Sequence, residues 1–195
     1  MLALAACAST RLPPDTPALA SSARQGNPMA QFELGMRLVS AAHGAAERAA
    51  GLAWIRRAAD ANLAIAQDRL GMMYLSGREV PQDTARALRW LHRAAERDAP
   101  AAQLQLGGLY TVGSLVPVDK AQAYYWYSIA AKPVRSSVTI FNIAQVRSLA
   151  RSRAQTLVPS LTAAERAAVE RRVAAWEPIA SVPYSGVIPM KGLWR

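Results

Sequence analysis

A strict 36-residue period is the feature of this sequence that most constrains its fold. When the chain is laid over itself at that shift, single residues and residue pairs coincide three times without any slip in register. The coinciding positions include Ala30, Ala66 and Ala102; Gln31, Gln67 and Gln103; Leu34-Gly35, Leu70-Gly71 and Leu106-Gly107; and Trp54, Trp90 and Trp126. A fixed period of this size is typical of stacked supersecondary units, each too small to bury its own apolar face.

Each copy of the period is expected to form two helices joined by a turn. The helical stripes of the second copy are Ala66, Leu70, Gly71 and Tyr74, followed by Ala87, Trp90, Leu91, Ala94 and Ala95. Gly77 is placed to end the first helix, and Asp83 is placed to cap the second. Because glycine inside a helix costs about 1 kcal/mol relative to alanine, its threefold recurrence predicts close approach of two helices. The rings expected in the core are Trp54, Trp90, Trp126, Tyr74 and Tyr110.

The combined pattern, AxAQxxLGxxY, then GxxVPxD, then AxxWxxxAA, resembles the Sel-one-like repeats, a branch of the tetratricopeptide superfamily. Three such repeats occupy residues 28–132. The resemblance implies an all-α fold, an α/α superhelix (solenoid) of helix-turn-helix repeats, and adaptor roles in complex assembly, signalling or the cell envelope. The sequence departs from the pattern where Asn62 and Asp98 replace the glycine that usually ends the second helix, and both residue types tolerate a left-handed conformation.

The regions before and after the repeats lack the 36-residue period and are expected to form a linker, capping helices and a tail. Residues 8–27 combine a proline-rich linker with a short helix, over 18–24, that takes the place of a second helix before the first repeat. Residues 133–178 are expected to form capping helices, one over about 138–155 and one that starts at Thr162 with the capping-box partner Glu165. Residues 179–195 form an irregular tail that is too apolar to be purely solvated, so it is expected to fold back onto the array or to dock on a partner.

Residues 1–7 resemble the remnant of a bacterial lipoprotein signal peptide. Leu4-Ala5-Ala6-Cys7 is similar to a lipobox, and Cys7, the only cysteine, would be the lipid attachment site. Only six residues precede Cys7, fewer than a signal peptide needs. Either the true start lies upstream, which we favour, or the resemblance is an accident of an alanine-rich terminus. The first reading implies a cell-envelope protein on the periplasmic side of the outer membrane, because Ala8 and Ser9, directly after the cysteine, lack the acidic residue that usually holds such lipoproteins at the inner membrane. The second implies a cytoplasmic protein.

Composition and motifs give no support to catalysis. The formal charge of +10 comes from 23 basic and 13 acidic residues, but no aromatic and basic platform accompanies it, so nucleic acid is not the expected partner. His43 and His92 belong to no metal-ligand or catalytic spacing. We therefore expect no catalytic residue, metal, cofactor or small-molecule substrate. An enzyme or enzyme accessory with an unrecognised site, and a basic cytoplasmic nucleic-acid binder, remain the alternatives.

The expected working surface is the concave side of the array, which the first helices of such repeats usually line. Positions on these helices outside the core stripe are the candidates for contact with another protein or peptide: Glu33, Met36, Arg37, Arg69, Met72, Met73, Gln105 and Leu109. Adaptable methionines beside arginines suit a protein-binding surface. The competing interpretation is that Met72 and Leu109 merely pack against the adjacent unit. Any membrane association is expected through the lipid anchor alone.

Overall fold

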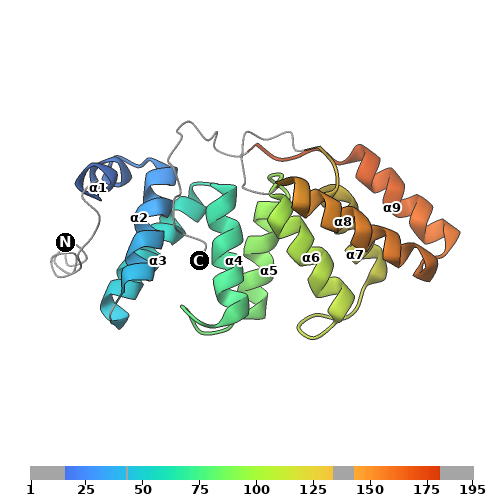
Figure 1. The fold of residues 1–195 in the computed structure, drawn as a ribbon, viewed down its shortest axis with the longest axis horizontal. Coiled ribbons are helices and arrows are strands. Elements are labelled where there is room, and N and C mark those ends of the chain that lie inside the picture. The colour runs from blue at the N-terminus through green and yellow to red at the C-terminus, as the bar shows by residue number, and fades with distance from the viewer. Residues whose placement is uncertain (1–15, 43, 134–142, 181–195) are drawn as a thin grey trace.

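The computed structural model describes residues 16–42, 44–133 and 143–180, and within these ranges the chain is helical, without a strand. The helices are α1 (Thr16–Arg24), α2 (Pro28–Ala41), α3 (Ala45–Asp60), α4 (Ala64–Ser76), α5 (Thr84–Ala95), α6 (Pro100–Val112), α7 (Lys120–Ala130), α8 (Ile143–Leu157) and α9 (Ala163–Ala175), with a short 3-10 helix, η2 (Val158–Ser160). They follow one another in chain order along the long axis of the molecule (Figure 1). The predicted all-α solenoid is confirmed.

Three helical hairpins, α2/α3, α4/α5 and α6/α7, form the body of the array. Each hairpin also contacts the next one through its second helix, α3 against α4 and α5 against α6. Helix α1 packs on α2 in the place of a preceding second helix, and α8 and α9 cover α7 at the other end. The array therefore has an atypical helix at each end of its described part, as repeat proteins require.

In the second and third hairpins an aspartate caps the second helix and a glycine ends the first, as predicted for the second repeat. The carboxylate of Asp83 accepts a hydrogen bond from the Arg86 backbone N–H at 2.8 Å, and Asp119 does the same for Gln122 at 2.9 Å. Gly77 and Gly113 end the first helices with φ of 68° and 75°, a left-handed conformation that glycine adopts without strain.

The connections between hairpins also turn through the left-handed region. Asn62 and Asp98 have φ of 65° and 60°, so both residues take the role of the missing glycine, as predicted. Gly26, with φ of 94°, does the same between α1 and α2. Because all three connections share this geometry, α1 joins the array as a true second helix.

A recurring buried glutamine links each hairpin to the one before it. The Nε2 atoms of Gln31, Gln67 and Gln103 donate to the carbonyl oxygens of Ala23, Ala59 and Ala95 at 3.1, 2.9 and 2.9 Å respectively. Each acceptor lies in the last turn of the preceding second helix, where backbone carbonyls have no partner within the helix. The repeat of glutamine in the sequence is thus explained by a repeated inter-unit hydrogen bond.

The recurring glycines mark the places where helices of one hairpin approach most closely. A Cβ atom built on Gly71 would lie 2.8 Å from Cγ of Leu91, and one built on Gly107 would lie 2.5 Å from ring carbons of Tyr127. In the first hairpin the two backbones themselves meet, since a Cβ on Gly35 would lie 2.7 Å from the carbonyl oxygen of Gly51. The predicted packing role of these glycines is confirmed.

The prediction that all five recurring rings are core residues holds for Trp126 and Tyr74, which are buried, but is wrong for the other three. Trp54 and Trp90 are only half-buried, and each ring packs against the core on one side. An arginine of the same helix lies over each ring, with Arg57 at 4.6 Å and Arg93 at 4.8 Å from the ring centroids. Tyr110 is likewise half-buried.

The start predicted for the first capping helix, at about residue 138, lies outside the described residues, whereas the predicted capping box is present. Residues 134–142 lie outside the described residues, and α8 runs over Ile143–Leu157. Thr162 and Glu165 form the capping box of α9: the Thr162 backbone N–H donates to Glu165 Oε2 at 2.8 Å, and the Glu165 N–H donates to Thr162 Oγ1 at 3.2 Å. Beyond α9, the Ile179 N–H donates to the carbonyl oxygen of Glu96 at 2.8 Å, so the start of the tail is held at the end of α5.

Replacing neighbouring glycines of α6 tests the close approach directly. Gly107→Ala is expected to destabilise the protein by about 1 to 3 kcal/mol, because the added Cβ overlaps the Tyr127 ring. Gly108→Ala meets no atom closer than 3.8 Å and is expected to be neutral or stabilising by up to about 1 kcal/mol. Urea unfolding of both variants measures the difference, and equal effects would contradict the packing argument.

Candidate protein-binding face

Helices α2, α4 and α6 present one aligned row of side chains, which we call the first-helix face. Helical spacing and the 36-residue period place its members on corresponding sides of the three helices. They are Glu33 and Met36 on α2; Arg69, Met72 and Ser76 on α4; and Gln105, Gly108 and Val112 on α6. Of the predicted contact residues, Arg37 and Leu109 flank this row, whereas Met73 does not belong to it.

Met73 corrects the sequence prediction. Its side chain is 1% exposed and lies in the hydrophobic cluster that holds α2, α3, α4 and α5 together. Met36, which is 6% exposed, belongs to the same cluster, so the contact role predicted for Met36 is wrong as well. Met72, its neighbour, is half-buried and remains on the first-helix face. A rotation of one residue along a helix is about 100°, which is enough to move a side chain from surface to core.

On α2 the face is formed by an ion pair and a buried methionine. Arg37 pairs with Glu33 one helical turn away, and Met36 is buried beside them. The Glu33 side chain is 3% exposed, and its Oε2 atom has no hydrogen-bond partner in the described part of the chain. A buried carboxylate oxygen without a donor is costly, so this position favours the approach of a donor group.

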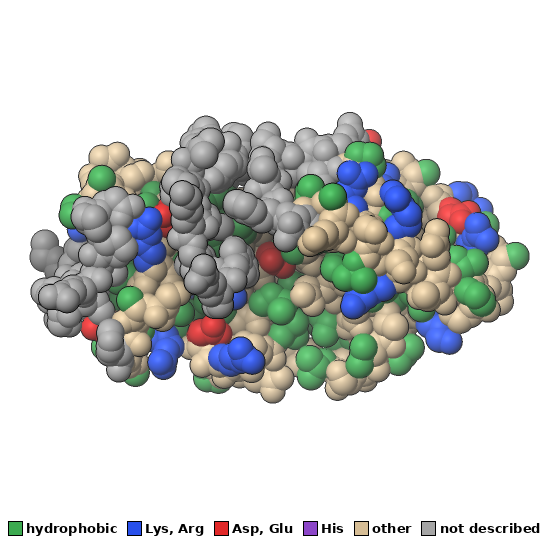
Figure 2. Space-filling view, in the orientation of Figure 1, with side chains coloured by type: hydrophobic (Ala, Val, Ile, Leu, Met, Phe, Trp, Pro, Cys, Tyr) green, Lys and Arg blue, Asp and Glu red, His purple; other side chains and the backbone are tan. Residues whose placement is uncertain are grey.

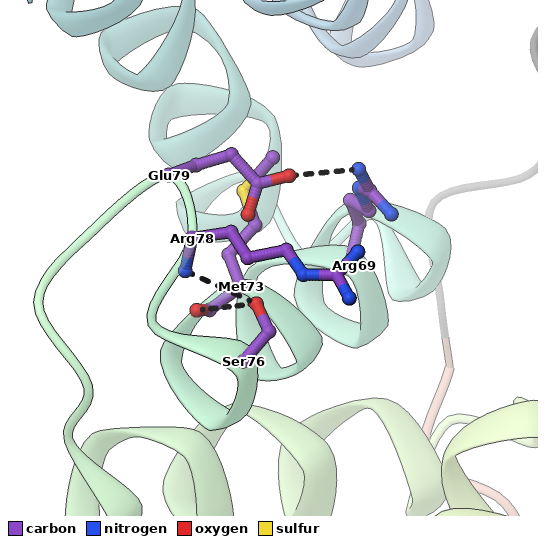
Figure 3. A network of polar contacts seen from close by, with 5 residues as sticks. All are labelled: Arg69, Met73, Ser76, Arg78 and Glu79. Carbon is purple, nitrogen blue, oxygen red and sulfur yellow. Dashed lines mark hydrogen bonds and ion pairs between the residues drawn. The ribbon is translucent and has the colours of Figure 1, made fainter.

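On α4 the face is connected to the following turn. Arg69 reaches from the helix to Glu79 and pairs with it at 3.3 Å, with Arg78 beside the pair (Figure 3). Ser76 Oγ donates to the carbonyl oxygen of Met73 at 3.2 Å and accepts from the Arg78 N–H at 3.5 Å. These contacts fix the end of α4 and hold Arg69 partly exposed at the rim.

Asp68 is a candidate that the sequence reasoning missed. Its Oδ1 atom is buried and has no hydrogen-bond partner among the described residues. Burial raises the pKa of this carboxyl from 3.8 to about 7, and the positive charge of Arg69 opposes the rise only in part. The corresponding residues of the other repeats are Phe32 and Leu104, so the signal was a lone carboxylate at an otherwise apolar position.

On α6 the face is apolar and continues into the turn. Gln105 and Leu109 are half-buried, and Leu109 packs against the core of the third hairpin, as the competing interpretation expected. Val112, Leu115 and Val118 are 71%, 39% and 55% exposed. Hydrophobic side chains gather in this lower part of the molecule, around α6 and its turn (Figure 2). The corresponding residues of the second repeat are polar, Ser76, Glu79 and Gln82.

A hollow of about 380 Å³ lies between α5, α7 and α9, away from the first-helix face. Its lining includes His92, Tyr125, Trp126, Arg172 and Trp176. The Arg172 guanidinium lies 4.3 Å from the centroid of the Tyr125 ring, so a cation of the chain itself already covers this aromatic wall. Burial lowers the pKa of His92, whose Nε2 lies 3.3 Å from the Tyr110 hydroxyl, as expected for a packed histidine. Within the described ranges, no group of three or more His, Cys, Asp or Glu residues could hold a metal ion.

Comparison with known proteins identifies the repeats. A family model of the Sel1 repeat matches residues 28–63, 64–98 and 100–132, more than half of the chain. The chain belongs to the Sel1-repeat family. Proteins of this family are generally protein-interaction scaffolds and typically not enzymes.

Two solved structures show the same fold. A Sel1 repeat protein from Oxalobacter formigenes is 34% identical, and the match covers 73% of this chain and 98% of that one, with a TM-score of 0.59. A protective antigen of uropathogenic Escherichia coli strains, which displays an SLR fold, is 24% identical with the same TM-score. The match covers 88% of this chain but only 37% of the antigen, and at this identity it concerns the fold alone. A search of curated proteins finds no match.

The raised pKa of Asp68 predicts a pH-dependent stability difference. The folded protein holds the Asp68 proton more tightly than the unfolded chain, so ionisation destabilises the fold increasingly as pH rises from about 4 to about 7. Asp68→Asn is therefore expected to raise the free energy of unfolding at about pH 8, with a smaller gain at about pH 4.5. Asp60→Asn, at an exposed position of α3, serves as the control. Urea unfolding at both pH values decides, and a pH-independent difference would refute the assignment.

Proposed function

We propose that this Sel1-repeat protein is a non-enzymatic adaptor that holds a partner protein or peptide on its first-helix face. The observation that carries the proposal is the composition of that face. The face carries half-buried Met72, the ion pairs of α2 and α4, and the exposed Val112. A flexible methionine can adapt to a partner, and an exposed apolar run with a charged rim is typical of protein-binding sites.

The ion pairs at the rim contribute selectivity rather than much affinity. Arg69 keeps 29% of its side chain exposed, so its guanidinium can exchange Glu79 for a carboxylate of a partner at little cost. The Oε2 atom of Glu33, which has no donor in the described part of the chain, favours a donor group at one defined point of the face. The face therefore suits a segment that has apolar side chains and at least one basic group.

We further propose that the protein acts in the bacterial cell envelope, tethered by lipid on Cys7. The support is the similarity of Leu4-Ala5-Ala6-Cys7 to a lipobox and the proline-rich stretch that follows it. Cys7 and the lipobox lie outside the described residues. None of the helices in the described ranges has the length and apolar character needed to cross a membrane.

Site-specific photocrosslinking tests the binding face. A photoreactive phenylalanine analogue at Met72 or Val112 is expected to crosslink a discrete partner in cells, whereas the same analogue at exposed Arg89 on α5 is not. Met72→Glu should reduce capture of that partner by at least about tenfold, because a charge would have to be desolvated at the contact. Crosslinking from Arg89 alone would place the partner on the second helices and refute the proposal.

The lipid anchor has its own test. Cys7→Ser, introduced into the gene with its full upstream region, is expected to abolish incorporation of a labelled fatty acid and to release the protein from the membrane fraction. Unchanged fractionation and labelling would remove the lipoprotein assignment and leave the adaptor proposal intact.

A further inference from the structure

Helix α8 takes the position of a fourth first helix in the array. It packs on α7, the second helix of the last repeat, just as α4 packs on α3 and α6 packs on α5, and it also contacts α6. Figure 1 shows α8 lying across α6 and α7. The contact with the first-helix face is made at Gly108, because a Cβ atom built there would lie 3.8 Å from Nη1 of Arg153. Arg153 of α8 therefore lies beside the α6 part of the first-helix face.

Arg153 is held in place by the third repeat but has no acidic partner among the described residues. Its guanidinium carbon lies 5.9 Å from the centroid of the buried Tyr127 ring, whereas the arginine itself is exposed. Arg37 and Arg69, on the same face, pair with carboxylates of the chain, but no carboxylate in the described ranges pairs with Arg153. Helix α8 carries three arginines and no acidic residue. A positioned and exposed cation without a counter-ion favours a ligand that brings a carboxylate.

The surface beside this cation is open and carries exposed apolar side chains. Gly108 stands where the second repeat has Met72, and a Cβ atom built there would meet no atom closer than 3.8 Å. Val112, one helical turn after Gly108 on α6, is 71% exposed. Leu149, one turn before Arg153 on α8, is 44% exposed. This arrangement suits a segment that places an acidic side chain over Gly108 and apolar side chains close by.

A peptide fits this surface better than nucleic acid or an anionic membrane does. Nucleic acids and anionic membranes present many phosphates, so they bind to broad arrays of lysine and arginine. Helix α9, which follows α8, interleaves acidic and basic residues, and its Arg166 pairs with Glu170 at 2.7 Å. Figure 2 shows basic side chains over α8, beside the hydrophobic side chains around α6 and its turn. A local cation next to apolar side chains is typical of a protein-binding site.

We propose that Arg153 binds an acidic side chain of a partner peptide on the first-helix face, with Gly108 leaving room for the carboxylate. Val112 and Leu149 contact apolar residues of the same peptide. The inference rests on the proposed function and deepens it, because it names the partner's chemistry at the α8 end of the face: an aspartate or glutamate beside apolar side chains. The planar guanidinium can donate two parallel hydrogen bonds to that carboxylate, which lysine cannot reproduce.

Charge reversal in the full chain tests the anchor. With a photoreactive phenylalanine analogue at Met72, Arg153→Glu is expected to reduce crosslinking of the partner in cells by at least about tenfold, because attraction becomes repulsion. Arg153→Lys keeps the charge but loses the planar donor pair, so it should reduce crosslinking by only about threefold. Arg171→Glu, at an exposed position of α9, makes the same charge change and should leave crosslinking within about twofold of the wild type. Unchanged crosslinking in Arg153→Glu would overturn the proposal.

Substitutions of Gly108 provide a test that leaves Arg153 in place. Gly108→Glu puts a carboxylate of the chain itself beside the guanidinium and is expected to reduce capture of the partner by at least about fivefold. Gly108→Gln has the same bulk without the charge and should capture at least about threefold more than Gly108→Glu. Gly108→Ala adds only a Cβ atom in open space and should behave as the wild type. Equal capture by the glutamate and glutamine variants would contradict the assigned charge.

Selection from a display library of random peptides tests the chemistry on the purified full chain. The selected peptides are expected to carry at least about twice the aspartate and glutamate content of the library, and those selected on Arg153→Glu are not. Equally acidic peptides on both proteins, or peptides rich in lysine and arginine on the wild type, would overturn the proposal. A DNA duplex and vesicles that contain phosphatidylglycerol are the competing probes. Binding of either probe that Arg153→Glu abolishes, with no acidic peptide selected, would assign the arginine to phosphate and overturn the proposal as well.

The two proposals fail in different ways. Crosslinking from Met72 that survives both Arg153→Glu and Gly108→Glu would refute this inference and leave the proposed function intact. Absence of any crosslinked partner from Met72 in the wild type, with acidic peptides still selected through Arg153, would refute the proposed function alone.

Discussion

The array depends on a hydrogen bond that each hairpin makes to the one before it. A second helix ends with carbonyl groups that have no donor inside the helix, and these ends are buried by the next unit. The amides of Gln31, Gln67 and Gln103 supply the donor. A buried carbonyl left without a partner costs about 1 to 3 kcal/mol, so neighbouring hairpins are held in one register. The same bond incorporates α1, which explains why the described array starts with a single helix.

The period predicted what the repeats share and could not predict where they differ. The left-handed turns at Asn62 and Asp98 and the close approach at Gly71 follow from shared positions, so the sequence was sufficient. The half-burial of Trp54 and Trp90 was mispredicted because helical spacing does not distinguish a ring that packs under an arginine of its own helix from one that a neighbouring unit encloses. Met73 was misplaced for a similar reason, since adjacent residues diverge by about 100°.

The first-helix face is built from the positions that the period leaves unconstrained. Core positions repeat as alanine, glutamine, leucine and glycine, whereas the face carries Glu33, Arg69 and Gln105 at one register position. At the next it carries Met36, Met72 and Gly108. Each helix is held by its core and its inter-unit amide, so most of these positions are not fixed by packing, with buried Met36 as the exception. They can therefore differ between units and present a partner with three distinct contacts.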